Sequence, residues 1–509
     1  MKKTLLILFA ISALFSINAI AQNGFCGMTV EEQLIIKERM MQNRANAANS
    51  VQVRTGVMWV PIQFHILTDN DGGNRVDIMK VLDMLCALNE DYLDQDIQYF
   101  MKDGLNFINN SSVNTNPNVG GPNNNPFAQT VMVGAKVLSA INIYIVKDIP
   151  SSSPGNTLGF YSPTFDWLVL NRSQVSAVNV ETLTHELGHF FTLPHPFLGW
   201  DGEYWEEGVH GNPAPINSPG GVKTELMNGN NCTFAGDGFC DTKPNYGLGF
   251  GWSGCNYNGN CMDPNGELLA TGIQENNYMA YFINCASEFT PEQKAAIAAD
   301  LNSRTSLHTT IEPDITAFTD SPTQNFPIDG EDTPLFNVVG FDWEPVAGAT
   351  SYVVEVDRQP NYSFEPSVKF VSGGTYVEFE DIFDADKTYY WRVKAIKEGN
   401  VCGEVLSTSF RTGTVTGVRE IKEVLNYTIS PNPISDEETL NINIETNEAF
   451  EAVINLYNLS GQKIKEVNAT FAHGTTNHQL SVGDLSEGMY IISIESENGV
   501  LTEKVVVTR

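Results

Sequence analysis

The run 185–189, with the sequence HELGH, carries the strongest chemical pattern in this chain of 509 residues. On a helix, His185 and His189 would lie one turn apart and project from one face, where they can bind one metal ion together. His195 follows six positions after His189 and can reach the same ion once the chain has left the helix. Three imidazole ligands leave the fourth zinc position open for water, which is typical of a catalytic zinc site. Glu186 is then placed to act on that water as a general base.

A helix must present these side chains to the metal. Apolar residues recur in this segment at Val180, Leu183, Leu187 and Phe190. The spacing predicts an amphipathic helix whose apolar face lies in a core. The alternative is a buried helix whose histidines have only structural partners.

Together with a downstream segment, this pattern resembles the metzincin metallopeptidases, whose signature is HExxHxxGxxH followed by a Met-turn. The segment 277–281, with the sequence NYMAY, looks like the Met-turn region of the pappalysin (M43) branch. The resemblance implies a zinc cofactor, with Met279 packed beneath the metal and Tyr281 donating a hydrogen bond to the oxyanion of the substrate. Thr192 stands where the family has glycine. A β-branched residue is costly in a turn that needs a positive φ, so we expect either a different turn or a less ideally placed His195.

These residues predict a zinc metalloendopeptidase that hydrolyses peptide bonds of extracellular proteins through a zinc-activated water, with Glu186 as the general base. Its partners would be protein or peptide substrates. Two alternatives stay open. One is a cell-surface adhesin or binding protein with a structural or vestigial zinc site, and the other is a zinc amidase or esterase. Glu186 favours the peptidase over the adhesin, since a purely structural zinc site has no need of a carboxylate at that position.

The start of the chain and its charge indicate an exported protein without nucleic acid as a partner. Residues 1–21 combine a basic start, an apolar stretch and small residues, which is typical of a Sec signal peptide. The apolar stretch is too short to span a membrane comfortably, and no later segment resembles a transmembrane helix. A net charge of −32 would repel nucleic acid.

Residues 22–54 are expected to be a pro-segment, with a helix between Thr29 and Ala48 and a cleavage point near Arg54. Cys26 lies near the start of this segment. Because a thiolate is a strong ligand for zinc, Cys26 is a candidate switch residue that fills the open zinc position and keeps the enzyme a zymogen. The alternatives are that Cys26 forms a disulfide or stays free.

Five of the eight cysteines cluster between residues 232 and 285. In an exported protein, such a cluster predicts disulfides. Pappalysins carry two disulfides in this region, and we expect Cys240 to pair with Cys261 and Cys255 to pair with Cys285. A zinc cluster built from these thiols is the weaker alternative, because the chain has no close CxxC pair here.

The segment 236–242, with the sequence GDGFCDT, combines carboxylates, carbonyls and glycine turns. Such oxygen-rich loops suit calcium. Pappalysins bind calcium in this region, so the resemblance implies a calcium ion with Asp237, Asp241 and Thr242 as ligands. A solvated turn without an ion is the alternative.

The chain is expected to be multidomain, with an α+β catalytic domain of the zincin/metzincin type followed by two all-β sandwich domains. Alternating residues around Trp343 and Trp391 resemble a fibronectin type III sandwich, which would bind matrix or sugar or serve as a spacer. The last segment opens near Ile429 and resembles the C-terminal sorting domain of the type IX secretion system. That resemblance implies contact with the secretion machinery and a secreted or surface-attached product. The expected parts are 1–21 signal peptide, 22–54 pro-segment, 55–305 catalytic domain, 306–332 linker, 333–413 fibronectin type III-like domain, 414–425 linker and 426–509 sorting domain.

Overall fold

The computed structural model describes residues 25–48, 56–120, 123–150, 157–178, 180–250, 252, 254–269, 273–282, 284–307, 312–363, 366–414, 421–435, 439–458, 463–497 and 499–508. The expected signal peptide and the expected cleavage point near Arg54 lie outside these residues. The chain divides into two compact units. The first comprises Met1–Glu331, Phe341–Val377 and Thr388–Phe410, and the second comprises Asp332–Gly340, Glu378–Lys387 and Arg411–Arg509.

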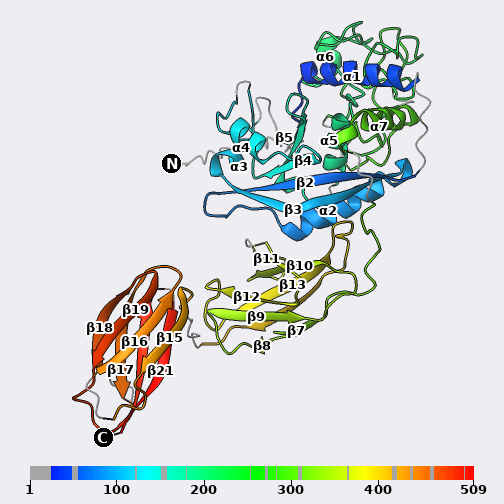
Figure 1. Cartoon of the computed structure of the whole chain (residues 1–509). Coiled ribbons are helices and arrows are strands. Elements are labelled where there is room, and N and C mark those ends of the chain that lie inside the picture. The colour runs from blue at the N-terminus through cyan, green and yellow to red at the C-terminus, as the bar shows by residue number, and fades with distance from the viewer. Residues whose placement is uncertain are drawn as a thin grey trace, which may run out of the picture. The chain divides into compact units, whose positions relative to one another are not determined.

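The first unit is built on a six-stranded sheet (Figure 1). In order across the sheet, its strands are β1 (Phe25–Cys26), β5 (Thr157–Ser162), β6 (Trp167–Asn171), β4 (Ile141–Val146), β2 (Met58–Thr68) and β3 (Ile97–Asn109). The four strands from β6 to β3 are parallel, whereas β5 is antiparallel to β6. The short strand β1 then pairs in parallel with β5 and extends the sheet by one strand. A segment of the expected pro-segment is therefore part of the sheet.

Two helices bury apolar side chains against this sheet. Helix α2 (Ile78–Asp91) is preceded by its N-cap residue Asp77, whose carboxylate accepts a hydrogen bond from the Lys80 N–H. Helix α5 (Glu181–Phe190) carries the HELGH run, and its Leu183 and Leu187 join one core with α2 and the sheet. The amphipathic helix predicted around the histidines is confirmed, because its apolar positions face this core.

Helix α1 (Val30–Ala48) packs against helix α7 (Pro291–Ser303). The α7 helix begins with a capping box, in which Thr290 and Gln293 satisfy each other's backbone N–H groups. The remaining short helices of the described chain are α3 (Ser111–Thr115), α4 (Ala128–Ala135), α6 (Glu207–His210), η1 (Leu93–Gln95), η2 (Arg172–Gln174) and η4 (Thr305–Leu307).

From residue 312 on, the regular structure of the described chain is entirely β-strand. One five-stranded sheet has the order β11-β10-β13-β14-β8, and one three-stranded sheet has the order β12-β9-β7. Trp391 of β13 contacts Phe341 of β9 with ring centroids 5.0 Å apart, so the expected tryptophan lies in a core between strands. These strands are β7 (Gln324–Phe326), β8 (Glu331–Asp332), β9 (Val338–Trp343), β10 (Ser351–Asp357), β11 (Ser367–Ser372), β12 (Tyr376–Glu380), β13 (Thr388–Ile396) and β14 (Leu406–Arg411).

Covalent and ionic contacts within the first unit join α2 to the sheet that contains β13. Cys86 of α2 forms a disulfide with Cys402, which follows β13 along the chain. Arg392 of β13 donates to Asp77 at 3.0 Å and to Glu355 at 2.6 Å. Because Glu355 is fully buried, its charge needs this partner.

Residues 421–508 of the second unit form two antiparallel sheets, β15-β16-β19 and β18-β17-β20-β21. Leu440, Ile442 and Ile444 lie at alternate positions and are buried in one core with Ile492 and Ile494. These strands are β15 (Val424–Ser430), β16 (Thr439–Thr446), β17 (Phe450–Asn458), β18 (Lys463–Phe471), β19 (Gly474–Ser481), β20 (Gly488–Ser496) and β21 (Gly499–Val507).

Candidate metal centre

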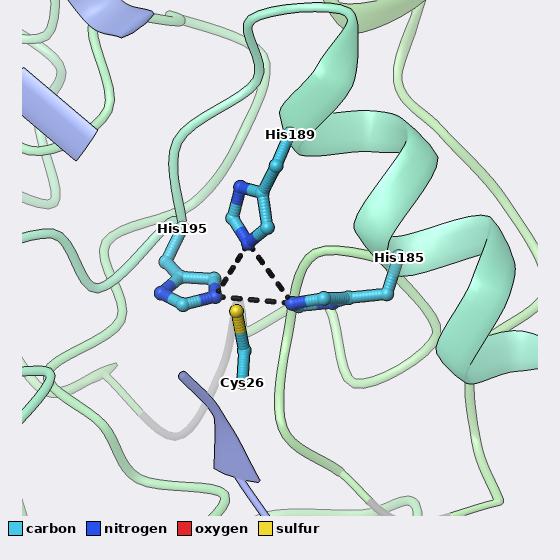
Figure 2. Close-up of side chains that lie close together, drawn as sticks. All are labelled: Cys26, His185, His189 and His195. Carbon is cyan, nitrogen blue, oxygen red and sulfur yellow. Dashed lines mark hydrogen bonds between the residues drawn. The ribbon is translucent and has the colours of Figure 1, made fainter. Parts of the chain in front are cut away.

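Three imidazoles converge on one point, with the Cys26 thiol directed at the same point (Figure 2). The Nε2 atoms of His185, His189 and His195 lie 3.0–3.1 Å from one another. On its other nitrogen, each ring has an acceptor. His185 Nδ1 lies 2.7 Å from the Tyr278 carbonyl oxygen, and His189 Nδ1 lies 2.7 Å from the Leu193 carbonyl oxygen. His195 Nδ1 lies 2.5 Å from Asp201 Oδ1.

This arrangement suits a metal cation. Since every Nδ1 faces an acceptor, each Nδ1 carries the proton and each Nε2 presents a lone pair. Three lone pairs directed at one another repel unless a cation lies between them. Zinc–nitrogen bonds of about 2.0–2.1 Å in tetrahedral geometry separate the nitrogens by about 3.3 Å, close to the spacing found here. Burial beside His195 lowers the pKa of His185 to about 3, so this ligand is neutral at physiological pH.

The turn before the third histidine has the backbone conformation that glycine usually adopts at this position. Thr192 has a φ of +71°, in the left-handed region. The Leu193 N–H donates to the Gly188 carbonyl at 2.9 Å and the Thr192 N–H donates to the His189 carbonyl at 2.9 Å, which together form a Schellman motif. The expectation of a different turn or a poorly placed third ligand is therefore wrong. Thr192 accepts a backbone strain of about 1–3 kcal/mol, and His195 still reaches the centre.

Glu186 lies beside the Cys26 thiol of the candidate centre and is buried. Its Oε2 accepts a hydrogen bond of 3.5 Å from the Cys26 thiol. Gly159 of β5 leaves room for this side chain, since a Cβ atom at that position would lie 3.2 Å from Glu186 Oε1. Burial raises the pKa of Glu186 to about 8. A nearby cation would act in the opposite direction, because it favours the charged carboxylate.

Met279 and Tyr281 both lie next to the HELGH helix and His195, as the resemblance implied. Met279 is buried against Gly188 of the HELGH run, where an added Cβ atom would lie 2.3 Å from the Met279 sulfur. The Tyr281 ring lies 4.9 Å from the His195 ring, centroid to centroid. Its hydroxyl accepts a hydrogen bond of 2.9 Å from the Cys26 backbone N–H.

The residues around Cys26 pair with strand β5, next to these groups. The Gly27 N–H donates to the Gly159 carbonyl at 2.8 Å, which continues the pairing of β1 with β5. The Cys26 sulfur and the three imidazole nitrogens all lie within 4.8 Å of one another. Cys26 is a free cysteine, so the alternative that it forms a disulfide is wrong. Burial, together with the charge of Glu186, raises the pKa of the Cys26 thiol, and a bound cation would lower it again.

Helix α1, which lies in the expected pro-segment, is held by polar contacts on two elements. Arg44 forms a salt bridge of 2.8 Å with Glu292, and Asn43 donates to Asp300 at 2.8 Å. The Lys37 ammonium donates to the carbonyl oxygens of three consecutive residues, 234–236, at 2.8–3.3 Å. The helix is therefore anchored on α7 and on the oxygen-rich loop.

Two buried carboxylates, Asp237 in that loop and Glu225 before it in the chain, each have an unpaired oxygen. Asp237 Oδ2 and Glu225 Oε2 have no hydrogen-bond partner within the described part of the chain, and both residues are at most 3% exposed. Burial raises the pKa of both carboxyl groups, and the charge of Asp237 raises the pKa of Glu225 further. Thr242 contributes by donating its hydroxyl to Asp237 Oδ1 at 3.1 Å. Paired carboxylates of this kind fit a divalent cation.

The expected calcium ligand Asp241 has a different role. One of its oxygens accepts the Thr290 hydroxyl at 2.7 Å, and the other accepts the Glu292 N–H at 2.7 Å. Asp241 therefore stabilises the start of α7, because the positive end of the helix dipole attracts a carboxylate. Glu225, which the sequence pattern did not single out, takes its place beside Asp237.

The disulfides differ from the expected pairing at one position. Cys255 bonds to Cys285, but Cys240 bonds to Cys232 and not to Cys261. A tight loop brings Cys232 and Cys240 together, with their Cα atoms 5.0 Å apart. Cys261 is instead a free, fully buried thiol inside a largely aromatic cluster.

Residues 428–508 match the family model of the secretion system C-terminal sorting domain. This protein is exported. The expected secreted or cell-surface location is thereby confirmed, and the sorting domain implies contact with the secretion machinery. No helix in the described part of the chain has the length and apolar character needed to cross a membrane.

An extracellular metalloprotease of Neurospora crassa is similar to this chain, with 26% identity over 210 residues that cover 37% of this chain and 68% of the relative. Among solved structures, the FN1–FN3 domains of chicken CNTN1 are 12% identical, with 40% of this chain and 70% of that chain covered and a TM-score of 0.18. Dimeric latent PorU from Porphyromonas gingivalis is 13% identical, with 38% of this chain and 20% of that chain covered and a TM-score of 0.15. TM-scores of this size do not assign a fold.

Proposed function

We propose that this chain is a secreted zinc-dependent endopeptidase of the pappalysin type, made as a zymogen. The observation that carries the proposal is the convergence of three Nε2 atoms, 3.0–3.1 Å apart, beside the Glu186 carboxylate and the Cys26 thiol. The similarity to an extracellular metalloprotease supports the same interpretation.

In this proposal His185, His189 and His195 hold a zinc ion, and Cys26 binds it as well while the pro-segment is present. When bound, zinc lowers the pKa of a water molecule and polarises the scissile carbonyl. Glu186 takes a proton from the attacking water and passes it to the leaving amine. The Tyr281 hydroxyl donates a hydrogen bond to the oxyanion that develops on the substrate. Burial raises the pKa of Tyr281, which keeps this donor protonated at neutral pH.

Latency follows from the same contacts. Strand β1 occupies the free edge of β5, and that edge would otherwise accept an extended peptide by strand addition. Cys26 meanwhile forms hydrogen bonds with Glu186 and Tyr281, the two residues that would act on the peptide. Removal of residues 22–54 would free both the edge and the centre.

The proposal also includes a calcium ion bound by Asp237 and Glu225. One oxygen of each carboxylate, Asp237 Oδ2 and Glu225 Oε2, has no hydrogen-bond partner among the described residues, which supports this ion because buried charges are normally paired or bound to metal.

The test uses the full chain, with its zinc content measured first and its cleavage of a mixed peptide library measured after limited proteolysis of the pro-segment. Glu186→Ala and a zinc chelator serve as controls. Cleavage by the wild type only, abolished by the chelator, is the expected result. One zinc ion per chain without any cleavage would favour the binding-protein alternative, and a chain that binds no zinc would refute the proposal.

A further inference from the structure

The three candidate ligands differ in what holds them. His185 and His189 donate their Nδ1–H groups to backbone carbonyls, whereas His195 donates to the Asp201 carboxylate at 2.5 Å. The contact is shielded from solvent, because the side chains of His195 and Asp201 are only 1% and 9% exposed. We propose that Asp201 is the positioning residue of the third metal ligand, a role that rests on the proposed zinc function.

The need for such a residue follows from the path of the chain. The first two histidines project from α5, which fixes their direction. His195 instead follows the strained turn at Thr192 and lies on a segment without helix or strand. Its ring stacks on Phe197 with centroids 4.5 Å apart, which limits tilting but leaves rotation in the ring plane open. The hydrogen bond to Asp201 fixes that rotation and directs Nε2 to the centre.

Asp201 is itself held in place. Its Oδ2 accepts the Gly199 N–H at 2.8 Å. Gly199 has a φ of +95°, and a Cβ atom there would lie 2.3 Å from the Ser218 hydroxyl oxygen, so only glycine fits this turn. The carboxylate is thus presented to His195 by a rigid loop. An imidazole that donates to a carboxylate is also a more basic ligand than one that donates to a carbonyl.

The pro-segment contacts the same pair. Gln33 of α1 is fully buried, and its side-chain amide donates to Asp201 Oδ1 at 2.6 Å. The Gln33 side-chain oxygen Oε1 accepts a hydrogen bond of 3.0 Å from the backbone N–H of His195. A second point of the pro-segment, besides Cys26, therefore contacts the third ligand and its partner.

The experiment compares full-chain Asp201→Asn with wild type and with Glu203→Gln. The control removes one negative charge two residues away, from a carboxylate that pairs with His210 instead. Zinc affinity is measured by competition with a chelator of known affinity, and the melting temperature is measured on the metal-free proteins. We expect zinc affinity to fall about ten- to a hundredfold in Asp201→Asn and to stay unchanged in Glu203→Gln, with equal metal-free melting temperatures.

Cobalt(II) substitution adds a spectroscopic readout. The visible absorption bands of the cobalt form should shift in Asp201→Asn and not in Glu203→Gln, since only the first alters the third ligand. Unchanged affinity and unchanged bands in Asp201→Asn would overturn the inference. A lower metal-free melting temperature with unchanged zinc affinity of the folded protein would also overturn it, by assigning Asp201 a structural role. If wild type itself binds no zinc, the proposed function fails instead.

Discussion

The Cys26 thiol donates a hydrogen bond to the Glu186 carboxylate over 3.5 Å, although 160 positions separate the two residues along the chain. The backbone N–H of the same cysteine donates to the Tyr281 hydroxyl at 2.9 Å. One residue of the proposed pro-segment thus contacts the proposed general base and the proposed oxyanion donor, and its sulfur lies among the candidate ligands. This relationship predicts that a single side chain maintains latency.

Replacing Cys26 with serine should activate the full chain without cleavage near Arg54. A hydroxyl is a much poorer zinc ligand than a thiolate, so the pro-segment would leave the centre more often. Because activity scales with the fraction of molecules in the competent state, we expect peptide hydrolysis to rise about tenfold or more over the unprocessed wild type. Cys261→Ser is the matched control, since Cys261 is the other free cysteine among the described residues. Equal, low activity in both variants would contradict the role of Cys26.

Glu186→Gln should abolish peptide hydrolysis while zinc binding persists. The amide keeps the shape of the side chain but cannot take a proton, and loss of a general base typically costs about 10²–10⁴ in rate. The comparison is best made in the Cys26→Ser background, with activity and zinc content measured on the same samples. A variant that retains more than about a tenth of the activity would show that another group takes the proton.

Calcium should stabilise the protein more at pH 8 than at pH 5. Burial raises the pKa of Glu225 to about 9 and the pKa of Asp237 to about 7. The folded state then binds protons more tightly than the unfolded state. Without calcium, this contribution to stability is complete below about pH 4 and is lost as the pH rises to about 9. A calcium ion replaces the lost protons, and thermal unfolding with and without calcium at both pH values measures the difference.

Two variants distinguish the effect of the proposed calcium ion from that of the contact between Asp241 and the start of α7. Asp237→Asn should remove most of the calcium effect. Asp241→Asn should keep it and lower the free energy of unfolding by about 1 kcal/mol, because Asp241 serves the start of α7. An equal calcium-induced rise in melting temperature at pH 5 and pH 8 would argue against titration of the two carboxylates.

Loss of the Cys86–Cys402 disulfide should lower the free energy of unfolding by about 2–5 kcal/mol. The bond spans 316 positions, and a longer closed loop restricts the unfolded chain more. The double variant Cys86→Ser/Cys402→Ser is compared with Cys232→Ser/Cys240→Ser, whose bond spans only 8 positions. Denaturant unfolding followed by tryptophan fluorescence should show the larger loss in the first variant. The reverse order would mean that the long-range bond contributes little.

Local patterns predicted the elements that carry the candidate centre. Helical spacing of apolar residues identified α5. The offset of His195 identified the third imidazole, since a short turn after a helix can return a side chain to the same face. These predictions succeed because the interacting groups lie within about one or two turns of chain.

Contacts between distant segments were not predictable in the same way. Gln33 contacts His195 across 162 positions of the chain, and Glu225 interacts with Asp237 across a segment that has no periodic pattern. Asp201 was the one missed residue with a local signal, because a carboxylate shortly after the third ligand is a natural hydrogen-bond partner for it. Cysteine spacing fixed neither the partner of Cys240 nor the bond between Cys86 and Cys402.

The Cys86–Cys402 bond closes residues 86–402 into a covalent ring. The proposed cut near Arg54 and the expected linker at 414–425, before the sorting domain, both fall outside this ring. The leader and the sorting tail can therefore be released while the proposed catalytic part and the fibronectin-like part remain one molecule. A protease that cut the expected linker at 306–332 would open the ring without detaching any part of the chain. On a non-reducing gel, such a nicked chain would still run as a single band, and only a reductant would reveal the break.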